Sequence, residues 1–218
     1  MKRKLFYTIF CSIFVIHSCG SSDNKNESNE ETKEERGLIE NISEASSAVK
    51  NLSKFEQYAK EMEQRMNELK KLNPISKEAL KLAIPEELAG LKRNSYNIGE
   101  MSAMSIASAK ADYISAETDK QLSLEIMDGA GEAASAMASI MFLAFQTDKD
   151  SENQDGFEKT IDLNGSRALV KETTYNEVKN SEIQWLHNKR FILTLKGKAL
   201  SYDELAEIQK NLDLSDLK

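Results

Sequence analysis

Four acidic residues gather in one stretch of the second half of the chain and could together supply oxygen ligands to a metal ion. They are Asp148, Asp150, Glu152 and Asp155. Hard cations such as Ca²⁺ bind several carboxylate oxygens at such short spacing. The calcium loop of an EF-hand also needs a glycine and a bidentate glutamate, where this chain has Asn153 and Lys159. The pattern therefore favours a solvated acidic loop, and these four residues remain the only candidate metal ligands.

A glycine-rich segment follows a predicted strand and precedes a predicted helix. Its sequence is Asp128-Gly129-Ala130-Gly131-Glu132-Ala133-Ala134. The pattern G-x-G-x-x-A at such a junction lets a backbone approach the pyrophosphate of a dinucleotide. That site needs a parallel strand, whereas the strand before this segment is predicted to pair antiparallel, and no second βαβ half follows. We therefore interpret the segment as a tight turn into a buried helix and expect no cofactor.

His187 and Trp185 are the other two residues that could take part in a site. His187 is the only histidine besides His17, so the chain lacks a two-histidine zinc site in its second half. No G-x-S-x-G nucleophile motif accompanies it. We expect His187 to be exposed in a turn. Trp185, the single tryptophan, is expected in the core, with a place at a pocket edge or an interface as the alternative.

The charge balance narrows the possible partners. The chain has 29 basic and 36 acidic residues and a formal net charge of −7 at pH 7. Nucleic-acid binding relies on a basic surface that neutralises phosphates, so this class of partner is excluded. A protein, a cation or an apolar ligand is the expected partner.

The first eighteen residues have the composition of a cleavable signal. Lys2, Arg3 and Lys4 are followed by an apolar run from Leu5 to Ile16. A bilayer core requires about 20 apolar residues, so this run is too short to span it. A charged start, a short apolar run and small residues at its end are typical of a signal peptide, which we predict for residues 1–18.

The segment Ile16-His17-Ser18-Cys19-Gly20 resembles the lipobox of bacterial lipoproteins, although His17 stands where a small residue is usual. The resemblance implies that the signal peptide is cleaved just before Cys19 and that Cys19 is lipidated. Several acyl chains make such an anchor stable. Gly20 in place of aspartate is similar to outer-membrane lipoproteins. The stretch 21–24 is similar to the surface-export tags of Bacteroidetes lipoproteins. The alternatives are an ordinary signal peptide or an uncleaved anchor.

Cleavage and lipidation would also leave the chain without a free cysteine thiol. Cys11 would leave with the signal and Cys19 would carry lipid, so no thiol would remain for a disulfide. The folded part must then be stabilised by its hydrophobic core alone.

The region after the lipobox divides into a polar tether and a long helix. Residues 19–36 contain Ser, Asn, Glu and Lys but no run of apolar residues, and we expect a disordered tether. Apolar residues then recur every three or four positions, which predicts a helix over residues 37–73 that ends at Asn73-Pro74. The stripe comprises Leu38, Ile42, Ala45, Val49, Leu52, Ala59, Met62, Met66 and Leu69. Three arrangements of this helix are compatible with the stripe. The helix packs on the following domain, it breaks into a hairpin near Ser53, or it forms a coiled coil with itself or a partner.

Residues 74–218 are predicted to form an α+β domain with an antiparallel sheet of about five to six strands and helices packed on one face. Helices are expected at 77–82, 86–91, 131–145 and 202–212, the last opened by a capping box at Ser201. Strands are expected at 107–113, 122–126, 157–163, 166–175, 182–186 and 190–195, with a tight turn at Asn164-Gly165. The order of these elements is similar to Mog1/PsbP-type secreted domains, a fold-level likeness that carries no function.

Three functions are compatible with these features. The leading expectation is a membrane-anchored, non-enzymatic envelope lipoprotein with a protein-interaction or structural role, in contact with the membrane through its lipid. The alternative is a carrier of lipid or another apolar ligand, because the small-residue strand 107–113 is expected to face the Ala- and Met-rich helix 131–145. A hydrolase that uses paired carboxylates is the third.

Overall fold

The computed structural model describes residues 54–101, 106–163 and 165–218. The predicted signal peptide, Cys19 with its expected lipidation, the predicted tether, the first part of the predicted long helix and Asn164 lie outside the described residues. Lys50 to Lys218 form one compact unit.

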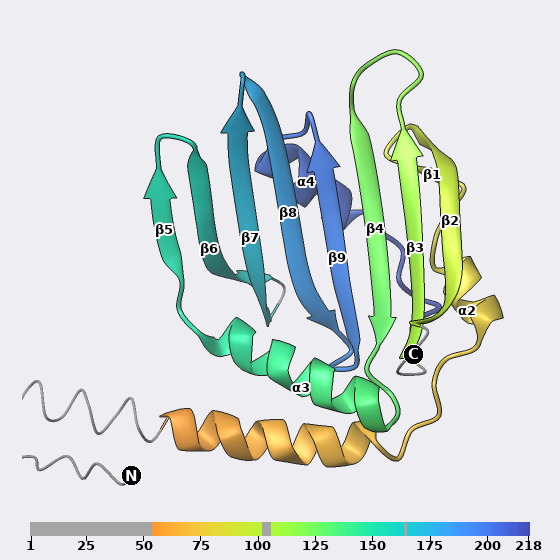
Figure 1. The fold of residues 1–218 in the computed structure, drawn as a ribbon, viewed down its shortest axis with the longest axis vertical. Coiled ribbons are helices and arrows are strands. Elements are labelled where there is room, and N and C mark those ends of the chain that lie inside the picture. The colour runs from red at the N-terminus through yellow and green to blue at the C-terminus, as the bar shows by residue number, and fades with distance from the viewer. Residues whose placement is uncertain (1–53, 102–105, 164) are drawn as a thin grey trace, which may run out of the picture. The chain divides into compact units, whose positions relative to one another are not determined.

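The centre of this unit is one antiparallel sheet of nine strands in the order β1-β2-β3-β4-β9-β8-β7-β6-β5 (Figure 1). One half of the sheet is built from β1 (Glu87–Leu88), β2 (Leu91–Met101), β3 (Ile106–Ile114) and β4 (Gln121–Asp128). The other half contains β5 (Asp150–Asn153), β6 (Gly156–Leu163), β7 (Ser166–Tyr175), β8 (Val178–His187) and β9 (Phe191–Lys198). The two halves meet where β4 pairs with β9.

The α+β class is confirmed, but the sheet is larger than the five to six strands expected. The three additional strands are β1, β2 and β5, which lie at or next to the two edges. All four residues of β5 are exposed, and the pairing of β2 shifts register between Arg93 and Ser95. β1 has only two residues, β5 is exposed on both faces, and the register shift interrupts the alternation along β2, so none of the three shows the pattern by which a half-buried strand is recognised.

The prediction of a helical turn over residues 86–91 is wrong. These residues form the β1–β2 hairpin, in which Leu88 pairs directly with Leu91. The two residues between them, Ala89 and Gly90, have φ values of 54° and 79°. Two consecutive left-handed residues make the turn that matches the twist of a hairpin.

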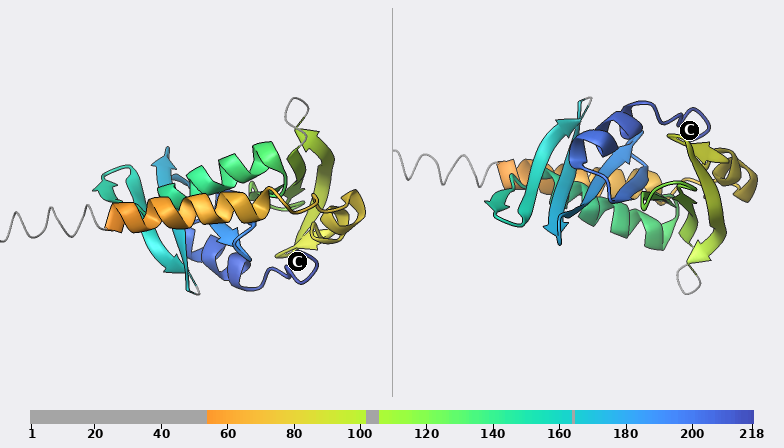
Figure 2. Two further views of the ribbon diagram at one scale, coloured as in Figure 1. Left: turned by 90° about the horizontal axis from the view of Figure 1, so that it is seen from below. Right: turned by 90° about the horizontal axis from the view of Figure 1, so that it is seen from above.

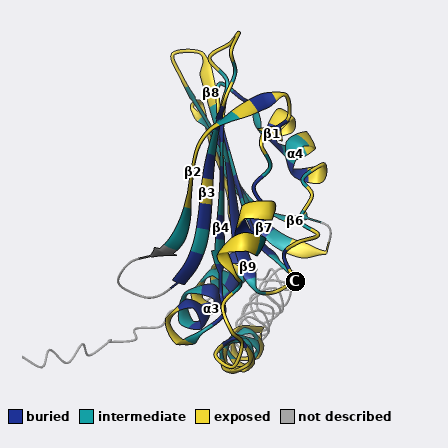
Figure 3. Cartoon of the chain, turned by 90° about the vertical axis from the view of Figure 1, so that its right-hand side faces the viewer, coloured by how far each residue is buried: buried dark blue, intermediate teal, exposed yellow. Residues whose placement is uncertain are grey.

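Helices cover both faces of the sheet, not one face as expected. On one face α4 (Tyr202–Lys210) and α2 (Lys77–Leu82) cover the larger core, in which Leu193 and Leu195 of β9 are fully buried. On the other face α3 (Glu132–Gln146) packs on Ile192, the residue before Leu193. Side chains alternate across a strand, so Ile192 and Leu193 serve opposite layers. Figure 3 shows the sheet edge-on with α3 and α4 on either side of it.

The helix of residues 54–69 lies beside α3 on the second face (Figure 2). Leu69 and Met62 pack there with Ala138 and Phe142 of α3. The helix ends at residue 69, not 73, because the amide of Leu72 turns back to the carbonyl of Leu69. Within the described residues the predicted stripe thus faces its own domain.

The expected contact between the small-residue strand and the Ala- and Met-rich helix does not form. Ala107, Ala109 and Ala111 of β3 belong to the larger core, whereas Ala138 of α3 belongs to the smaller core on the opposite face. The premise for an apolar-ligand carrier at that interface is therefore wrong.

Candidate functional site

One hollow in the described part of the chain lies between the sheet and the C-terminal residues 211–218. It has a volume of about 670 Å³. Its apolar lining consists of Leu163, Trp185, Leu186, Leu212, Leu214 and Leu217. Its polar lining consists of Ser166, His187, Asn188, Gln209, Lys210, Ser215 and Lys218. A hollow of this size that combines apolar and polar lining residues can accommodate a small molecule.

The floor of the cavity comes from the last residues of β8. Trp185 is 4% exposed and belongs to the larger core. The same residue also lines the cavity. The expectation of a core tryptophan and its alternative of a pocket edge are therefore both realised.

His187 is half-buried at the end of β8, so the prediction of an exposed turn residue is wrong. Burial lowers the pKa of its imidazole, and the backbone of Leu217 opposes this in part. The turn itself begins one residue later, where Asn188 and Lys189 have positive φ. The prediction failed because the C-terminal residues, distant in sequence, cover the end of the strand.

Gln209 is the polar residue that lies deepest in the lining. It is 8% exposed, near the end of α4. Its Oε1 atom is buried and has no hydrogen-bond partner among the described residues. A buried amide oxygen normally accepts a hydrogen bond, so this acceptor is an exception that calls for a donor. Nothing in the sequence distinguishes Gln209 from the other polar residues of its helix.

The helix that carries Gln209 is held firmly at its start. Ser201 and Glu204 form the predicted capping box, with the Ser201 side chain accepting from the Glu204 amide and the Glu204 carboxylate accepting from the Ser201 amide. A hydrogen bond from Lys120, together with those from Ser201, lowers the pKa of Glu204 to about 2. Glu172 of β7 accepts from the amide of Tyr202 at 2.7 Å. These contacts fix α4 over the sheet.

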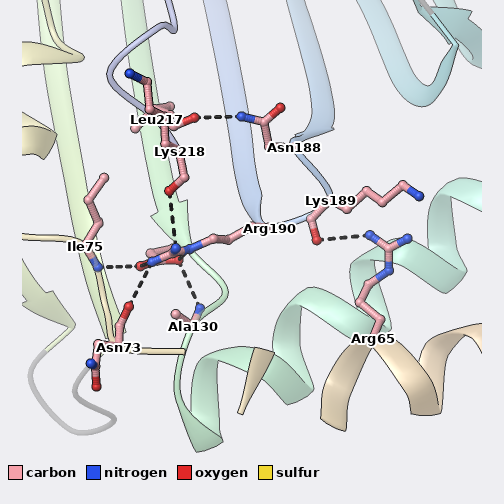
Figure 4. A network of polar contacts seen from close by, with 10 residues as sticks. Arg65, Asn73, Ile75, Ala130, Asn188, Lys189, Arg190, Leu217 and Lys218 are labelled. Carbon is pink, nitrogen blue, oxygen red and sulfur yellow. Dashed lines mark hydrogen bonds and ion pairs between the residues drawn. The ribbon is translucent and has the colours of Figure 1, made fainter. Parts of the chain in front are cut away.

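The roof of the cavity, the C-terminal tail, is fixed by the turn between β8 and β9. Asn188 donates to the carbonyl of Leu217 at 2.7 Å, and Arg190 donates to the backbone oxygen of Lys218 at 3.3 Å (Figure 4). Leu217 is fully buried. The tail therefore has a defined position over the cavity.

Arg190 also forms the most buried ion pair of the described residues. Its Nε and Nη2 donate to the two oxygens of Asp128, at 2.7 and 2.8 Å. Asp128 is 0% exposed and accepts further hydrogen bonds from the amides of Ile75 and Ala130. Arg190 donates in addition to the carbonyl of Asn73 (Figure 4). This network joins the start of the domain, the end of β4 and the β8–β9 turn.

The glycine-rich segment takes part in this junction. A side chain at Gly129 would place its Cβ 2.6 Å from the carbonyl oxygen of Arg190. The amide of Gly131, whose φ is 94°, donates to the carbonyl of Leu69. The interpretation as a tight turn into a buried helix agrees with this geometry.

The candidate metal ligands of the acidic stretch are mostly paired with cations. Asp148 forms an ion pair with Arg167, while Asp150 and Glu152 both pair with Lys159. Asp155 is not part of these pairs, and its backbone carbonyl accepts from Thr174. Within the ranges that the structure describes, no group of three or more potential ligands is arranged around a common point. The stretch includes β5, so it is in part a strand and not only a loop.

Comparison with known proteins adds no relative to this picture: no family model, curated protein or solved structure matches the chain. Among the described helices, none is both long enough and apolar enough to cross a membrane.

Proposed function

We propose that this chain is a lipid-anchored outer-membrane envelope protein whose folded domain binds a small apolar ligand and catalyses no reaction. The observation that carries the proposal is the cavity of about 670 Å³ under the C-terminal tail. Ligand sites of small molecules have volumes of roughly 300–1,000 Å³ and mostly apolar walls. This cavity replaces the strand–helix interface that the sequence pattern favoured.

The anchor rests on the lipobox resemblance around Cys19. Labelling of cells that express the chain with a palmitate analogue is expected to label the protein. Cys19→Ala is expected to remove the label, because the lipobox resemblance makes Cys19, and not Cys11 of the signal peptide, the lipidated cysteine. Label that persists in the Cys19→Ala variant would count against the anchor but not against the ligand site.

The ligand site can be tested through Trp185, the only tryptophan of the chain. Because its ring lines the cavity, an apolar fluorophore bound there should quench its emission in a saturable way. Native mass spectrometry of the purified protein should also detect any lipid that remains bound. The mature chain from residue 19, with Cys19→Ser, avoids the acyl chains in both measurements.

A filled cavity provides the matched comparison. Ser166 is exposed and lines the cavity, so Ser166→Phe should occupy the hollow without disturbing the core, and we expect at least a tenfold loss of probe affinity. Ser151→Phe, on the exposed edge strand β5, should leave the affinity unchanged. Equal binding by both variants would place the probe elsewhere and refute the proposed site.

A protein partner is the second candidate, favoured by large apolar side chains on the two helices of the smaller core. Phe55 is 59% exposed and Ile140 is 65% exposed. Apolar residues at such positions are typical of contact surfaces when they gather into a patch. Light scattering after size exclusion should detect self-association through the predicted helix 37–73, and Phe55→Ser should abolish it. A monomer at all concentrations would leave a second type of protein as the only partner.

A further inference from the structure

We infer that the ligand of the cavity under the C-terminal tail is a neutral, mainly apolar molecule with one N–H or O–H donor, and that Gln209 recognises this donor. The inference rests on the proposed function, because it names the chemical class of ligand for the same site. It goes beyond cavity shape, since shape alone selects only for size and apolar character.

The first step is the burial and the hydrogen bonding of Gln209. Its side chain lines the cavity and is 8% exposed, and its Oε1 atom has no partner among the described residues. An amide oxygen only accepts hydrogen bonds. The group that completes it must therefore be a donor, which an apolar ligand without N–H or O–H does not provide.

The second step is that the other polar groups of the lining are already occupied or lie outside the interior. Asn188 donates to the carbonyl of Leu217, and Lys210 is paired with Glu207 at 2.6 Å. Lys210 and Lys218 are exposed, so the charged side chains of the lining stand at its rim. Burial lowers the pKa of His187, which favours the neutral imidazole. The interior thus has no charge to neutralise a charged ligand.

The third step is access to the oxygen. The Oε1 atom is itself covered by the protein, so a ligand donor reaches it only when the amide rotates. The terminal torsion of a glutamine side chain has a broad energy profile, which permits this rotation. Trp185, Leu212 and Leu214 supply the apolar wall around it. A single buried hydrogen bond inside an apolar wall discriminates strongly between ligands with and without the matching group.

Two probes of nearly the same shape separate the donor from the apolar body. N-phenyl-1-naphthylamine has one N–H, and 1-phenoxynaphthalene has an ether oxygen in its place. Both are titrated into the mature chain with Cys19→Ser, and quenching of Trp185 is measured. We expect the amine to bind about tenfold more tightly than the ether, the ratio that one hydrogen bond of ordinary strength provides.

Substitution of Gln209 tests the residue itself. Gln209→Leu and Gln209→Met remove the amide but keep the size of the side chain, and we expect both to bind the two probes equally. Gln184→Leu makes the same change on β8, on the face opposite to that of Trp185, and should keep the tenfold preference. Since the empty protein would lose an unsatisfied acceptor, the melting temperature of both Gln209 variants should stay equal to that of the unaltered chain or rise.

The outcomes separate this inference from the proposed function. If the unaltered chain binds both probes equally, the inference fails while the ligand site stands. If it binds neither probe, both fail. If both Gln209 variants melt at a lower temperature than the unaltered chain, the amide oxygen is satisfied within the fold, for instance through a bound water, and the inference is overturned.

Discussion

At Asp128 a carboxylate without solvent contact is satisfied entirely by donors from the protein. Two come from the Arg190 guanidinium and two from the amides of Ile75 and Ala130. A buried charge is tolerated when it is paired and fully hydrogen-bonded. Asp128 precedes the glycine-rich segment, and sequence reasoning singled out the glycines but not the carboxylate or its partner.

Asp128→Ala is expected to lower the free energy of unfolding by about 3–5 kcal/mol, because Arg190 would remain largely buried without its counter-charge. Urea denaturation provides the measurement. Asp112→Ala removes a carboxylate from an exposed pair with Lys110, 3.9 Å apart, and should cost only about 0–1 kcal/mol. A similar small loss in both variants would mean that the buried pair contributes no more than a surface pair.

Gly129→Ala is expected to destabilise the domain by about 1–3 kcal/mol or more, because the new Cβ would lie 2.6 Å from the Arg190 carbonyl oxygen and 2.8 Å from the Ala138 Cβ. Thermal melting measures the loss. Gly99→Ala in β2 is the control, since its nearest neighbour would be a side-chain atom of Asn97 at 3.7 Å. The expectation is contradicted if the two variants melt together.

Among the elements, the helix of residues 54–69 shows how tertiary contacts decide between sequence-level alternatives. Arg65 lies 4.2 Å over the ring of Phe142 and donates to the carbonyl of Lys189. Leu69 is 4% exposed in the smaller core. The pattern of apolar residues predicted a helix with one apolar face, but a helix packed on its own domain and a coiled coil share that pattern.

Leu69→Ala should therefore cost about 2–5 kcal/mol, as expected when a leucine is truncated in a packed core. Leu82→Ala, the same truncation at a residue that is 68% exposed at the end of α2, should change the free energy of unfolding by less than about 0.5 kcal/mol. Chemical denaturation of both variants distinguishes a docked helix from a free one. A Leu69→Ala variant as stable as the control would show that this helix is not part of the cooperative unit.

For the whole molecule, the half-buried imidazole of His187 links stability to pH. Burial holds its pKa below the usual 6.5, so the unfolded chain takes up the proton first as the pH falls. Above about pH 6.5 both states are neutral and His187 adds nothing; below it, stability falls until the pH reaches the lowered pKa of the folded state.

The urea midpoint of the mature chain should consequently decrease between pH 7.5 and pH 5.5, and His187→Gln should flatten this part of the profile. No other histidine remains after position 17, so the assignment is direct. The same decrease in the His187→Gln variant would assign the effect to carboxylates instead.

Local features of the domain were predictable from the sequence because they depend on residues close together in the chain. The helix α2, the capping box of α4 and the strands β3, β4 and β7 all appear where the pattern placed them. The signal peptide and the lipidation of Cys19 stay predictions. The strands β1, β2 and β5 were missed because β1 is very short, β5 is exposed on both faces and a register shift interrupts β2.

The sequence by itself determined most of the element types, the α+β class and the capping box of α4, since these follow from periodicity and neighbouring side chains. Only the tertiary structure decided that α3 and α4 lie on opposite faces of the sheet. It also joined Asp128 to Arg190, which lie 62 positions apart, and closed the C-terminal tail over Gln209, Trp185 and His187. Such contacts depend on how distant segments pack, and no local pattern records which of two equally apolar faces a helix will cover.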